Sequence, residues 1–484
     1  MSSHRPEIGR FAETFEQVGA ALDAWLASDR TDPMRSPTDW RAELTGPVPQ
    51  QGIGADATLR EFTSLVLPNG PHLTSDASWG WITTGPSTVP TAISAASMIA
   101  SPQRQTLTAF NLLEEQGLEW LAQMCGLSAH MKGVFSSGGS TANLVALGAA
   151  RQWALEQQGI DPSGDGFDAN TLAMYTSDQA HHTVQRSAGV LGIGRSRVRS
   201  IPTDDAMRID LEALEAAMKE DQAAGITPVA VVVAAGTTNT GSIDPIRGAG
   251  EIAKQYNAWF HVDGAYGLPG ILDDRLTVLY DGLELADSVI TDPHKWLNVP
   301  VGVAATFVRD RAILHRAFTQ EPADYLEGAF SDDDVQVSLD SMGIPYFDFG
   351  VELSSPVRGV AVWGVLRELG VDGVRARVMQ DNDFARHVAS RARAHPRLET
   401  LLDPVLSICV FRYRPDRAVS DASIDDANRD ILRALARETR FVVSSTLVKG
   451  HFALRPCFIN PRTTLPDVDE FVDTVIALGE RAEV

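Results

Sequence analysis

Two charged side chains that follow apolar runs are the strongest candidates for chemistry. Lys295 lies in TDPHKWLNVP, where Trp296 and Leu297 would hold its amine against apolar surface and favour the neutral, nucleophilic form. Asp263 ends the run WFHVD, where its carboxylate is either a turn cap or the partner of a cationic ring nitrogen. The two residues indicate amine chemistry beside a carboxylate, or else a solvated lysine and a structural cap.

Two further segments have the composition of ligand-binding turns. Residues 136–140 read SSGGS, so backbone N–H groups could approach an anion while Ser140 caps a helix. A plain tight turn is an equal alternative, because the segment lacks the Walker lysine and the GxGxxG spacing. His181 and His182 begin an expected helix, either as structural caps or as catalytic groups. No companions stand at metal-ligand spacing, so we expect no metal.

Alternating strand and helix patterns must position these side chains. From about Gly133, apolar runs alternate with helical segments, which predicts a mostly parallel sheet covered on both faces. The expected strands are Val134–Phe135, Thr171–Tyr175, Arg197–Pro202, Val229–Ala235, Trp259–Asp263, Ser288–Thr291 and Val301–Val308. The expected helices are Thr141–Gln158, Ala180–Leu191, Asp210–Ala223 and Ile246–Tyr256. Because ligands bind at the carboxyl ends of such strands, the four polar segments should converge.

The chain divides into three parts by pattern. Residues 1–94 read as an N-terminal helical segment, and residues 95–366 as the large α/β domain. Residues 367–484 read as a small α+β domain. Its expected elements are a helix at Val371–His395, strands at Val405–Tyr413, Phe441–Leu447 and His451–Ile459, a helix at Asp425–Thr439 and a final helix.

Composition excludes several classes of protein. The 41 Lys and Arg against 63 Asp and Glu give a net charge of −22, which makes nucleic acid and membrane surfaces poor partners. Three scattered cysteines fit a reducing cytoplasm better than a disulfide framework. The N-terminus lacks the apolar run of a secretory signal, and no stretch is long and apolar enough to span a bilayer. We therefore expect a soluble, cytoplasmic protein.

The order of these segments resembles a known family. The runs FSSGGSTANLVALGAAR, SDQAHHTVQRSAG, GTTNTGSIDPI, WFHVDGAYG and DSVITDPHKWLNVP are similar to those of the group II pyridoxal-phosphate-dependent amino acid decarboxylases. The resemblance extends from about His72 to Arg358 and is weaker beyond. It implies a fold-type I, aspartate aminotransferase-like enzyme that binds pyridoxal 5'-phosphate. It also implies a homodimer.

The resemblance assigns four residues to the reacting centre. Lys295 should form the Schiff base with the cofactor, and Asp263 should keep the pyridine nitrogen protonated so that the ring accepts electrons. His181 should stack on the ring. His294 should lie beside the Schiff base, where it assists exchange of the amine or binds substrate.

The resemblance also assigns the residues around the cofactor's periphery. Gly139 and Ser140 should hold the phosphate at their helix N-terminus, with help from Asp292, where some relatives have Asn. Thr237 and Ala265 should line the edge of the cofactor.

Family members protonate the α-carbon with a tyrosine on a mobile loop. Gap-free counting from Trp363 places Tyr346 at that position, and Tyr325 is the rival. Trp79 and Trp81 offer stacking surface for a substrate, and Ser354 falls where relatives tune their choice of aromatic substrate.

The expected reaction is α-decarboxylation of an L-amino acid to an amine and carbon dioxide, with an aromatic substrate favoured. An acidic, basic or aliphatic substrate stays open. An aldehyde-forming, oxygen-consuming reaction on the same scaffold is a second alternative, against which Tyr346 argues. A non-catalytic protein that binds pyridoxal phosphate is a remote third.

Overall fold

A seven-stranded sheet forms the centre of the large domain in this computed structural model. The structure describes residues 11–28, 40–70, 73–101, 103–104, 108–319, 343–416 and 420–482. The strand order is β2-β8-β7-β6-β5-β3-β4, and β8 alone runs antiparallel to its neighbours. The strands are β2 (Lys132–Ser136), β3 (Leu172–Ser177), β4 (Val198–Ile201), β5 (Thr227–Ala234), β6 (Trp259–Asp263), β7 (Ser288–Thr291) and β8 (Ala304–Val308).

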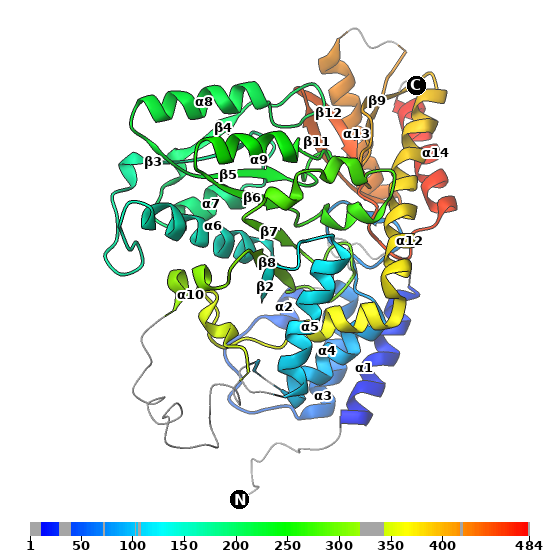
Figure 1. Ribbon diagram of the computed structural model, residues 1–484. Helices are drawn as coiled ribbons and strands as arrows, with labels where there is room; N and C mark the ends of the chain where they lie inside the picture. Colours follow the sequence, from blue (N-terminus) through cyan, green and yellow to red (C-terminus); the bar gives the residue numbers. More distant parts are fainter. Residues whose placement is uncertain are drawn as a thin grey trace, which may run out of the picture.

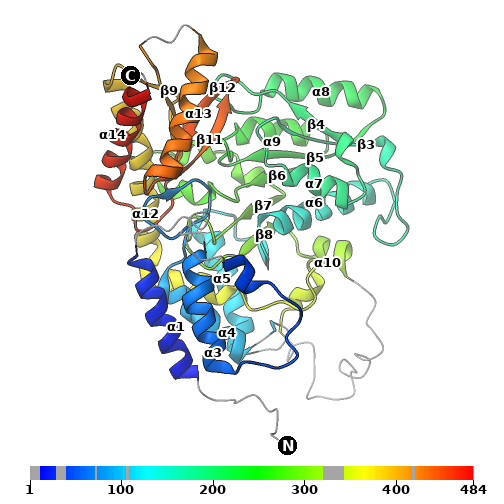
Figure 2. The same ribbon diagram turned by 180° about the vertical axis from the view of Figure 1, so that it is seen from behind.

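Helices cover both faces of this sheet, as near-continuous apolar strands require. The helices are α6 (Gly139–Glu156), α7 (Thr183–Val190), α8 (Leu211–Ala223) and α9 (Ile246–Gln255). Figures 1 and 2 show α6 and α7 on one side of the strands and α8 and α9 on the other. The Asp210 carboxylate caps α8 by accepting a hydrogen bond from the Ala213 amide. The expectation of an α/β, fold-type I body with a mostly parallel sheet is confirmed.

The small domain packs three helices against a five-stranded sheet of order β1-β11-β12-β10-β9. Its strands are β1 (Ser78–Trp79), β9 (Leu398–Leu402), β10 (Val410–Tyr413), β11 (Val442–Val448) and β12 (His451–Arg455). Its helices are α13 (Asp421–Glu438), α14 (Leu465–Ala482) and the second half of α12 (Gly359–Ala394). β1 comes from the N-terminal part of the chain and pairs in parallel with β11. The small domain is therefore not built from the C-terminal residues alone.

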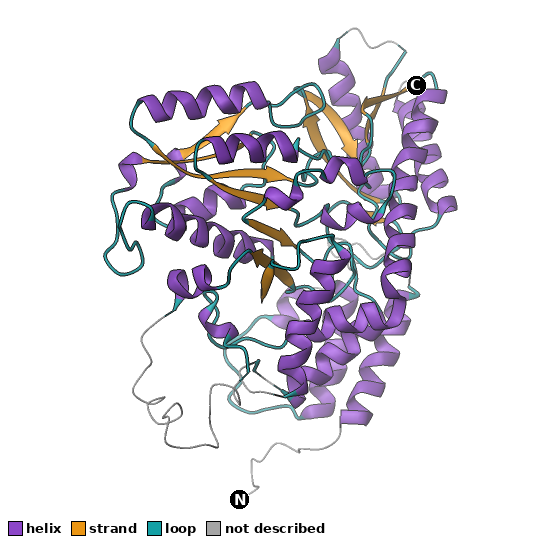
Figure 3. Ribbon diagram, in the orientation of Figure 1, coloured by secondary structure: helices purple, strands orange, loops and turns teal. Residues whose placement is uncertain are grey.

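The helices α1 (Phe11–Leu26), α2 (Trp40–Leu44), α3 (Ala55–Glu61), α4 (Thr88–Ala100) and α5 (Ala109–Met124) gather at one end of the molecule (Figure 3). The remaining helix, α10 (Ala312–Phe318), packs against α6. A π-helical turn follows α3 at Phe62–Val66, and 3-10 turns cover Leu67–Asn69, Ala169–Thr171, Arg195–Arg197, Leu268–Leu272, Thr277–Tyr280, Leu283–Leu285 and Tyr346–Asp348 (η10). No helix in the described ranges is long and apolar enough to cross a bilayer.

The two boundaries expected between the three parts of the chain both fall within helices of the structure. The boundary at residues 94 and 95 lies inside α4. The boundary at residues 366 and 367 lies close to a kink in α12, where Gly370 takes φ 65° and ψ 174°. A positive φ favours glycine, which explains how one helix can turn from the large domain toward the small one.

Candidate active site

The polar segments converge at one edge of the large sheet. β2 ends at Ser136, β3 at Ser177, β5 at Ala234, β6 at Asp263 and β7 at Thr291. These five strands are parallel to one another, so the turns that follow them meet at the same edge.

Lys295 lies in the turn after β7 and pairs with a buried carboxylate. Its Nζ is 3.0 Å from Asp292 Oδ2, and the side chains are 21% and 2% exposed. His294 Nδ1 donates a hydrogen bond to the Val303 carbonyl at 2.7 Å, which directs Nε2 toward Asp292 at 3.7 Å. Burial lowers the pKa of His294, and the nearby Asp292 only partly offsets this. His294 is therefore a neutral imidazole beside the lysine.

The N-terminus of α6 faces the same carboxylate. Gly138 is its N-cap with φ 153°, and Ser140 is exposed in the first turn. A methyl group added to Gly139 would lie 2.6 Å from Asp292 Oδ2, so only glycine fits there without displacing Asp292. Free backbone N–H groups at a helix N-terminus bind anions such as phosphate.

Asp263 is oriented by two donors. The Asn143 amide donates to Oδ2 at 3.0 Å, and the Ala265 backbone N–H donates to Oδ1 at 3.1 Å. Ala265 is thus held against Asp263 at the end of β6, and its side chain is 9% exposed. The carboxylate is fixed in place while remaining partly accessible.

His181 lies in the turn between β3 and α7, within electrostatic reach of Asp263, Lys295 and Asp292. Its Nδ1 is 2.9 Å from Thr183 Oγ1. Burial lowers the pKa of His181, with partial compensation from Asp263, so the ring is neutral near pH 7. His182 follows it with an exposed side chain, and the ring centroids are 4.2 Å apart.

Thr237 lies in the turn after β5, and the small domain contacts this turn through Arg455. Its hydroxyl is 2.9 Å from that of Thr240. Arg455, at the end of β12, donates to the backbone carbonyls of Thr238 at 2.9 Å and Asn239 at 3.1 Å. The same guanidinium also donates to the Gly80 carbonyl at 3.5 Å, so the backbone that leads into Trp81 shares Arg455 with this turn. The Trp81 side chain is 55% exposed.

Trp79 does not fit its expected role as a substrate wall. Its side chain is fully buried in the small-domain core, with ring centroids 5.0 to 5.5 Å from those of Phe441, Phe458 and Phe471. Its Nε1 donates to Thr463 Oγ1 at 2.8 Å. Because β1 pairs with β11 inside the small domain, Trp79 packs in that domain's core, which corrects the expectation.

Tyr346 does not fit the role of a mobile-loop acid. Its side chain is fully buried in η10, and its hydroxyl donates to the Glu115 carboxylate. Arg104 and Arg311 lie near its ring, 5.7 and 5.5 Å from the centroid. Burial and then Glu115 raise the pKa of the hydroxyl above its ordinary range. Tyr346 is a structural residue in this arrangement, and the rival Tyr325 lies outside the described residues.

Ser354 belongs to a segment that is tied to the site by an arginine. Arg358 donates to the Gly302 carbonyl at 2.8 Å and to Glu352 at 2.7 Å. Gly302 precedes Val303, whose carbonyl accepts the His294 hydrogen bond. The exposed Ser354 side chain is therefore on a segment linked to the lysine turn, but no described contact joins it to Lys295.

Sequence reasoning missed Asn143 and His261. Asn143 lies one helical turn after Gly139, so both face the same way, and His261 shares a face of β6 with Asp263. His261 Nε2 is 3.0 Å from Asn143 Oδ1. The helical spacing from Gly139 and the alternation of side chains along the strand that ends at Asp263 could have identified both residues from the sequence.

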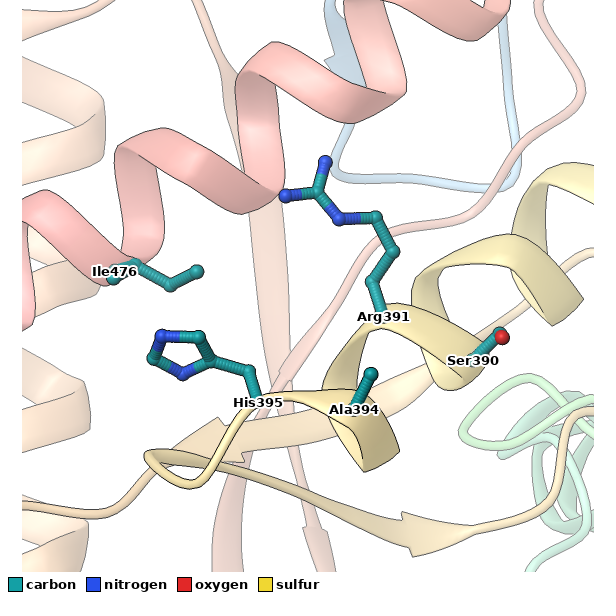
Figure 4. A pocket seen from close by; sticks show the side chains of 5 residues that line it. All are labelled: Ser390, Arg391, Ala394, His395 and Ile476. Atoms are coloured by element: carbon teal, nitrogen blue, oxygen red, sulfur yellow. The ribbon is translucent and has the colours of Figure 1, made fainter.

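A separate hollow is lined by residues that are distant in sequence from these turns. It measures about 270 Å³ between α12 and α14, and Figure 4 shows its lining of Ser390, Arg391, Ala394, His395 and Ile476. Arg391 there already pairs with Asp469 at 2.7 Å and with Asp473 at 2.5 Å. The hollow has a histidine, His395, but no lysine or carboxylate among the residues that line it.

The site's donors and acceptors fit pyridoxal phosphate. Asp292 Oδ1 is buried without a hydrogen-bond partner among the described residues, as are the hydroxyls of Ser136, Ser177 and Thr291 at the same strand ends. The site also combines a primary amine, a carboxylate that could face a ring nitrogen, and a helix N-terminus suited to a phosphate. These are the groups that an aldehyde-bearing, phosphorylated pyridine needs. Asp292 is an exception, since a carboxylate can only accept hydrogen bonds and pairs with Lys295 here.

Comparisons with known proteins agree with this chemistry. An aromatic-L-amino-acid decarboxylase from Bacillus atrophaeus is 30% identical over 372 residues, covering 77% of this chain and 74% of the relative. An L-2,4-diaminobutyrate decarboxylase from Acinetobacter baumannii is 26% identical over 490 residues, covering 98% and 94%. The structure of Oryza sativa TDC with PLP and tryptamine superimposes with a TM-score of 0.85 at 25% identity, covering 99% of this chain and 100% of that one.

The family model described as the pyridoxal-dependent decarboxylase conserved domain matches residues 97–414. This range contains the turns at Gly139, His181, Asp263 and Lys295. The match and the 30% identical relative confirm the resemblance drawn from those motifs. The chain belongs to the pyridoxal-dependent decarboxylases, a family of carboxy-lyases that act on amino acids with pyridoxal phosphate as cofactor.

Proposed function

We propose that this carboxy-lyase converts an aromatic L-amino acid into the corresponding amine and carbon dioxide, with one proton replacing the carboxylate at the α-carbon. The observation that carries the choice of substrate is Trp81, a half-exposed aromatic residue that follows Gly80, whose carbonyl shares Arg455 with the turn after β5. An aromatic substrate would gain stacking area there. Two relatives that are 30% identical are named as aromatic-amino-acid and tryptophan decarboxylases, which supports the same choice.

The cofactor supplies a pyridine ring that takes up the electron pair released when carbon dioxide departs. Lys295 would supply the amine that binds the cofactor covalently, and Asp263 would pair with the ring nitrogen. His181, neutral and half-buried, would cover one face of the ring and exclude water from it. His294 would accept protons at Nε2 beside the lysine, because its Nδ1–H already donates to the Val303 carbonyl. Gly139 and Ser140 would hold the phosphate at the start of α6.

A substrate panel tests the proposal. The holoenzyme should release carbon dioxide and amine from tryptophan, tyrosine or phenylalanine with a kcat/KM at least tenfold above that for histidine, 2,4-diaminobutyrate, glutamate, lysine or leucine. A preference for 2,4-diaminobutyrate or histidine would assign the chain to another branch of the family. Bound cofactor without turnover of any amino acid would favour a non-catalytic protein.

Trp81 can be tested against the same panel. Trp81→Ala should raise KM for the aromatic substrate about tenfold, since a stacking pair contributes about 0.5–1.5 kcal/mol beyond area burial. Turnover of a poor aliphatic substrate by the same variant is the control and should change less than twofold. Equal losses for both substrates would remove Trp81 from substrate selection.

The panel also separates simple decarboxylation from the aldehyde-forming reaction. With Tyr346 committed to Glu115, its presence no longer argues against oxygen consumption. We propose amine as the product, since the relatives that cover most of this chain are named as decarboxylases. Release of aldehyde, ammonia and peroxide in place of amine would contradict this.

We further propose that the chain works as a homodimer. Large apolar side chains are exposed on several helices of the first 124 residues, including Phe11 and Phe15 on α1, Met98 and Ile99 on α4, and Leu112 on α5. Val301, near the lysine turn, is also 71% exposed. Burial of such apolar surface against a second copy would favour association. Sedimentation equilibrium should give twice the 52.2 kDa chain mass, and a monomer with full activity would contradict it.

A reducing compartment such as the cytoplasm is also proposed. Cys125, Cys409 and Cys457 are buried free thiols in the structure. Protein purified without reductant and then unfolded should titrate three thiols. Fewer would show that the chain forms disulfides and would contradict the proposed compartment.

A further inference from the structure

A single buried amide connects the two residues that would enclose the cofactor ring. Asn143 Nδ2 lies 3.0 Å from Asp263 Oδ2 and 3.2 Å from Thr183 Oγ1, while its Oδ1 lies 3.0 Å from His261 Nε2. The carboxylate can only accept, so the NH₂ group must face Asp263 and the carbonyl oxygen must face His261. The amide orientation is thus determined by chemistry.

This orientation fixes every proton along one branch. Because Asn143 Oδ1 is an acceptor, His261 must carry its proton on Nε2. Burial lowers the pKa of His261 to about 4, so the ring is neutral and its Nδ1 is an acceptor. Ser288 Oγ, 2.8 Å away, therefore donates to that nitrogen. Ser288 in turn accepts from Trp259 Nε1 at 2.7 Å, and Trp259 can only donate.

The second branch leads to His181. Thr183 Oγ1 accepts from the Asn143 amide, so its own proton points to His181 Nδ1 at 2.9 Å. The Thr183 backbone N–H approaches the same nitrogen at 3.4 Å, which also requires an acceptor there. His181 therefore carries its proton on Nε2.

Because this hydrogen-bond network is buried, it depends on the orientation of the Asn143 amide at its centre. Asn143 is 1% exposed, Thr183 2%, and His261 and Ser288 are fully buried. Turning the amide by 180° would place its carbonyl oxygen against the Asp263 carboxylate and its NH₂ against the His261 N–H. Both contacts would be lost in a place that water reaches poorly.

We propose that Asn143 is a positioning residue that aims the Asp263 carboxylate and, through Thr183, holds His181 in its Nε2–H tautomer. His261, Ser288 and Trp259 act through Asn143 by locking the orientation of its amide. The proposal deepens the proposed function, on which it rests for what Asp263 and His181 contact.

Two substitutions separate this role from simple packing. Asn143→Leu keeps the approximate volume and removes every hydrogen bond, whereas Asn143→Asp keeps the shape and turns the donor toward Asp263 into an acceptor. Gln152→Leu is the matched control, because Gln152 is a 2% exposed amide on the same helix that bonds Glu156 and Asp161 instead. Each variant is reconstituted with pyridoxal phosphate.

We expect Kd for pyridoxal phosphate to rise about tenfold in Asn143→Leu, and more in Asn143→Asp, where two carboxylates face each other. The visible circular dichroism of the bound cofactor should weaken in both, and kcat should fall more than KM rises. Gln152→Leu should match the wild type in all three measurements even if its melting temperature drops.

Nitrogen-15 NMR of the wild-type holoenzyme tests the protonation pattern without any Asn143 variant. With the signals of His181 and His261 assigned by substituting each residue, both should be neutral with the proton on Nε2. A proton on His261 Nδ1, or wild-type cofactor affinity and dichroism in Asn143→Asp, would overturn the proposal. Failure of the proposed function would differ, because wild type would then release no carbon dioxide from any amino acid whatever the tautomers.

Discussion

Lys295 Nζ lies 3.0 Å from Asp292 Oδ2, and the same carboxylate oxygen would be 2.6 Å from a methyl group on Gly139. The lysine turn after β7 and the start of α6 therefore meet at one buried carboxylate. A change at Gly139 must be transmitted to the lysine. This contact links the proposed phosphate end of the site to its reactive amine.

Gly139→Ala should disrupt that link. The added methyl group must push Asp292 away, and Asp292 has little room because it is 2% exposed and paired with Lys295. We expect Kd for pyridoxal phosphate to rise at least tenfold, measured by titration of cofactor-free protein. Gly46→Ala is the control, since a methyl group there meets no atom of the described residues within 4 Å and should leave Kd unchanged. An unchanged Kd in Gly139→Ala would show that the phosphate binds elsewhere.

Asp263→Asn should retain cofactor and lose most turnover. The amide keeps the shape of the side chain but cannot hold a pyridine nitrogen protonated, so the ring becomes a weaker electron acceptor. A loss of about 4 kcal/mol of transition-state stabilisation corresponds to roughly a thousandfold lower kcat. If the variant turns over at close to the wild-type rate, Asp263 is a structural cap.

Tyr346→Phe should affect stability and not the product. The variant removes the donor to Glu115, which we expect to lower the free energy of unfolding by about 1–2 kcal/mol. Tyr175→Phe is the matched control, because Tyr175 is also fully buried and donates to an acidic residue, Asp221, at 2.8 Å. Both variants should form amine within twofold of the wild-type rate. Peroxide and aldehyde from Tyr346→Phe alone would restore Tyr346 as the acid.

Buried histidines should make stability fall with acid. His261 has an ordinary pKa of 6.5 in the unfolded chain, and burial lowers its pKa to about 4 in the folded protein. Between these values the unfolded chain binds the extra proton, so stability is fully present above about pH 6.5 and is lost as pH falls toward 4. The pKa values of His181 and His294 are lowered in the same direction.

Urea unfolding at a series of pH values measures this loss, to which His261 contributes on the order of 3 kcal/mol. His130→Gln, a change at an exposed histidine, should leave the profile unaltered. A free energy of unfolding that is constant from pH 7 to pH 4.5 would show that His261 is protonated in the folded protein.

The sequence predicted the large domain well because each of its strands and helices is specified by a pattern of residues that are close together in the chain. Each expected strand from Thr171–Tyr175 to Val301–Val308 overlaps an observed strand, since runs such as PVAVVVA can only be buried sheet in this setting. The convergence of Gly139, His181, Asp263 and Lys295 followed from parallel strand order alone.

The failures came from contacts between distant parts of the chain. Trp79 sits in a two-residue strand that pairs with β11, and no local pattern connects Ser78 with Val442. Tyr346 was placed by counting along the chain, which ignored its burial against Glu115. Asn143 was overlooked because its role depends on His261 and Thr183, which only the folded sheet brings to it.

Reduction of the holoenzyme with borohydride tests the central claim most directly. If the turn after β7 forms the site, one pyridoxyl group per chain should become fixed to Lys295, and peptide mapping should find it in the segment TDPHKWLNVP. Lys295→Ala should bind no cofactor covalently. A label on a different lysine, or a protein that stays unlabelled under saturating pyridoxal phosphate, would contradict the assignment of the site.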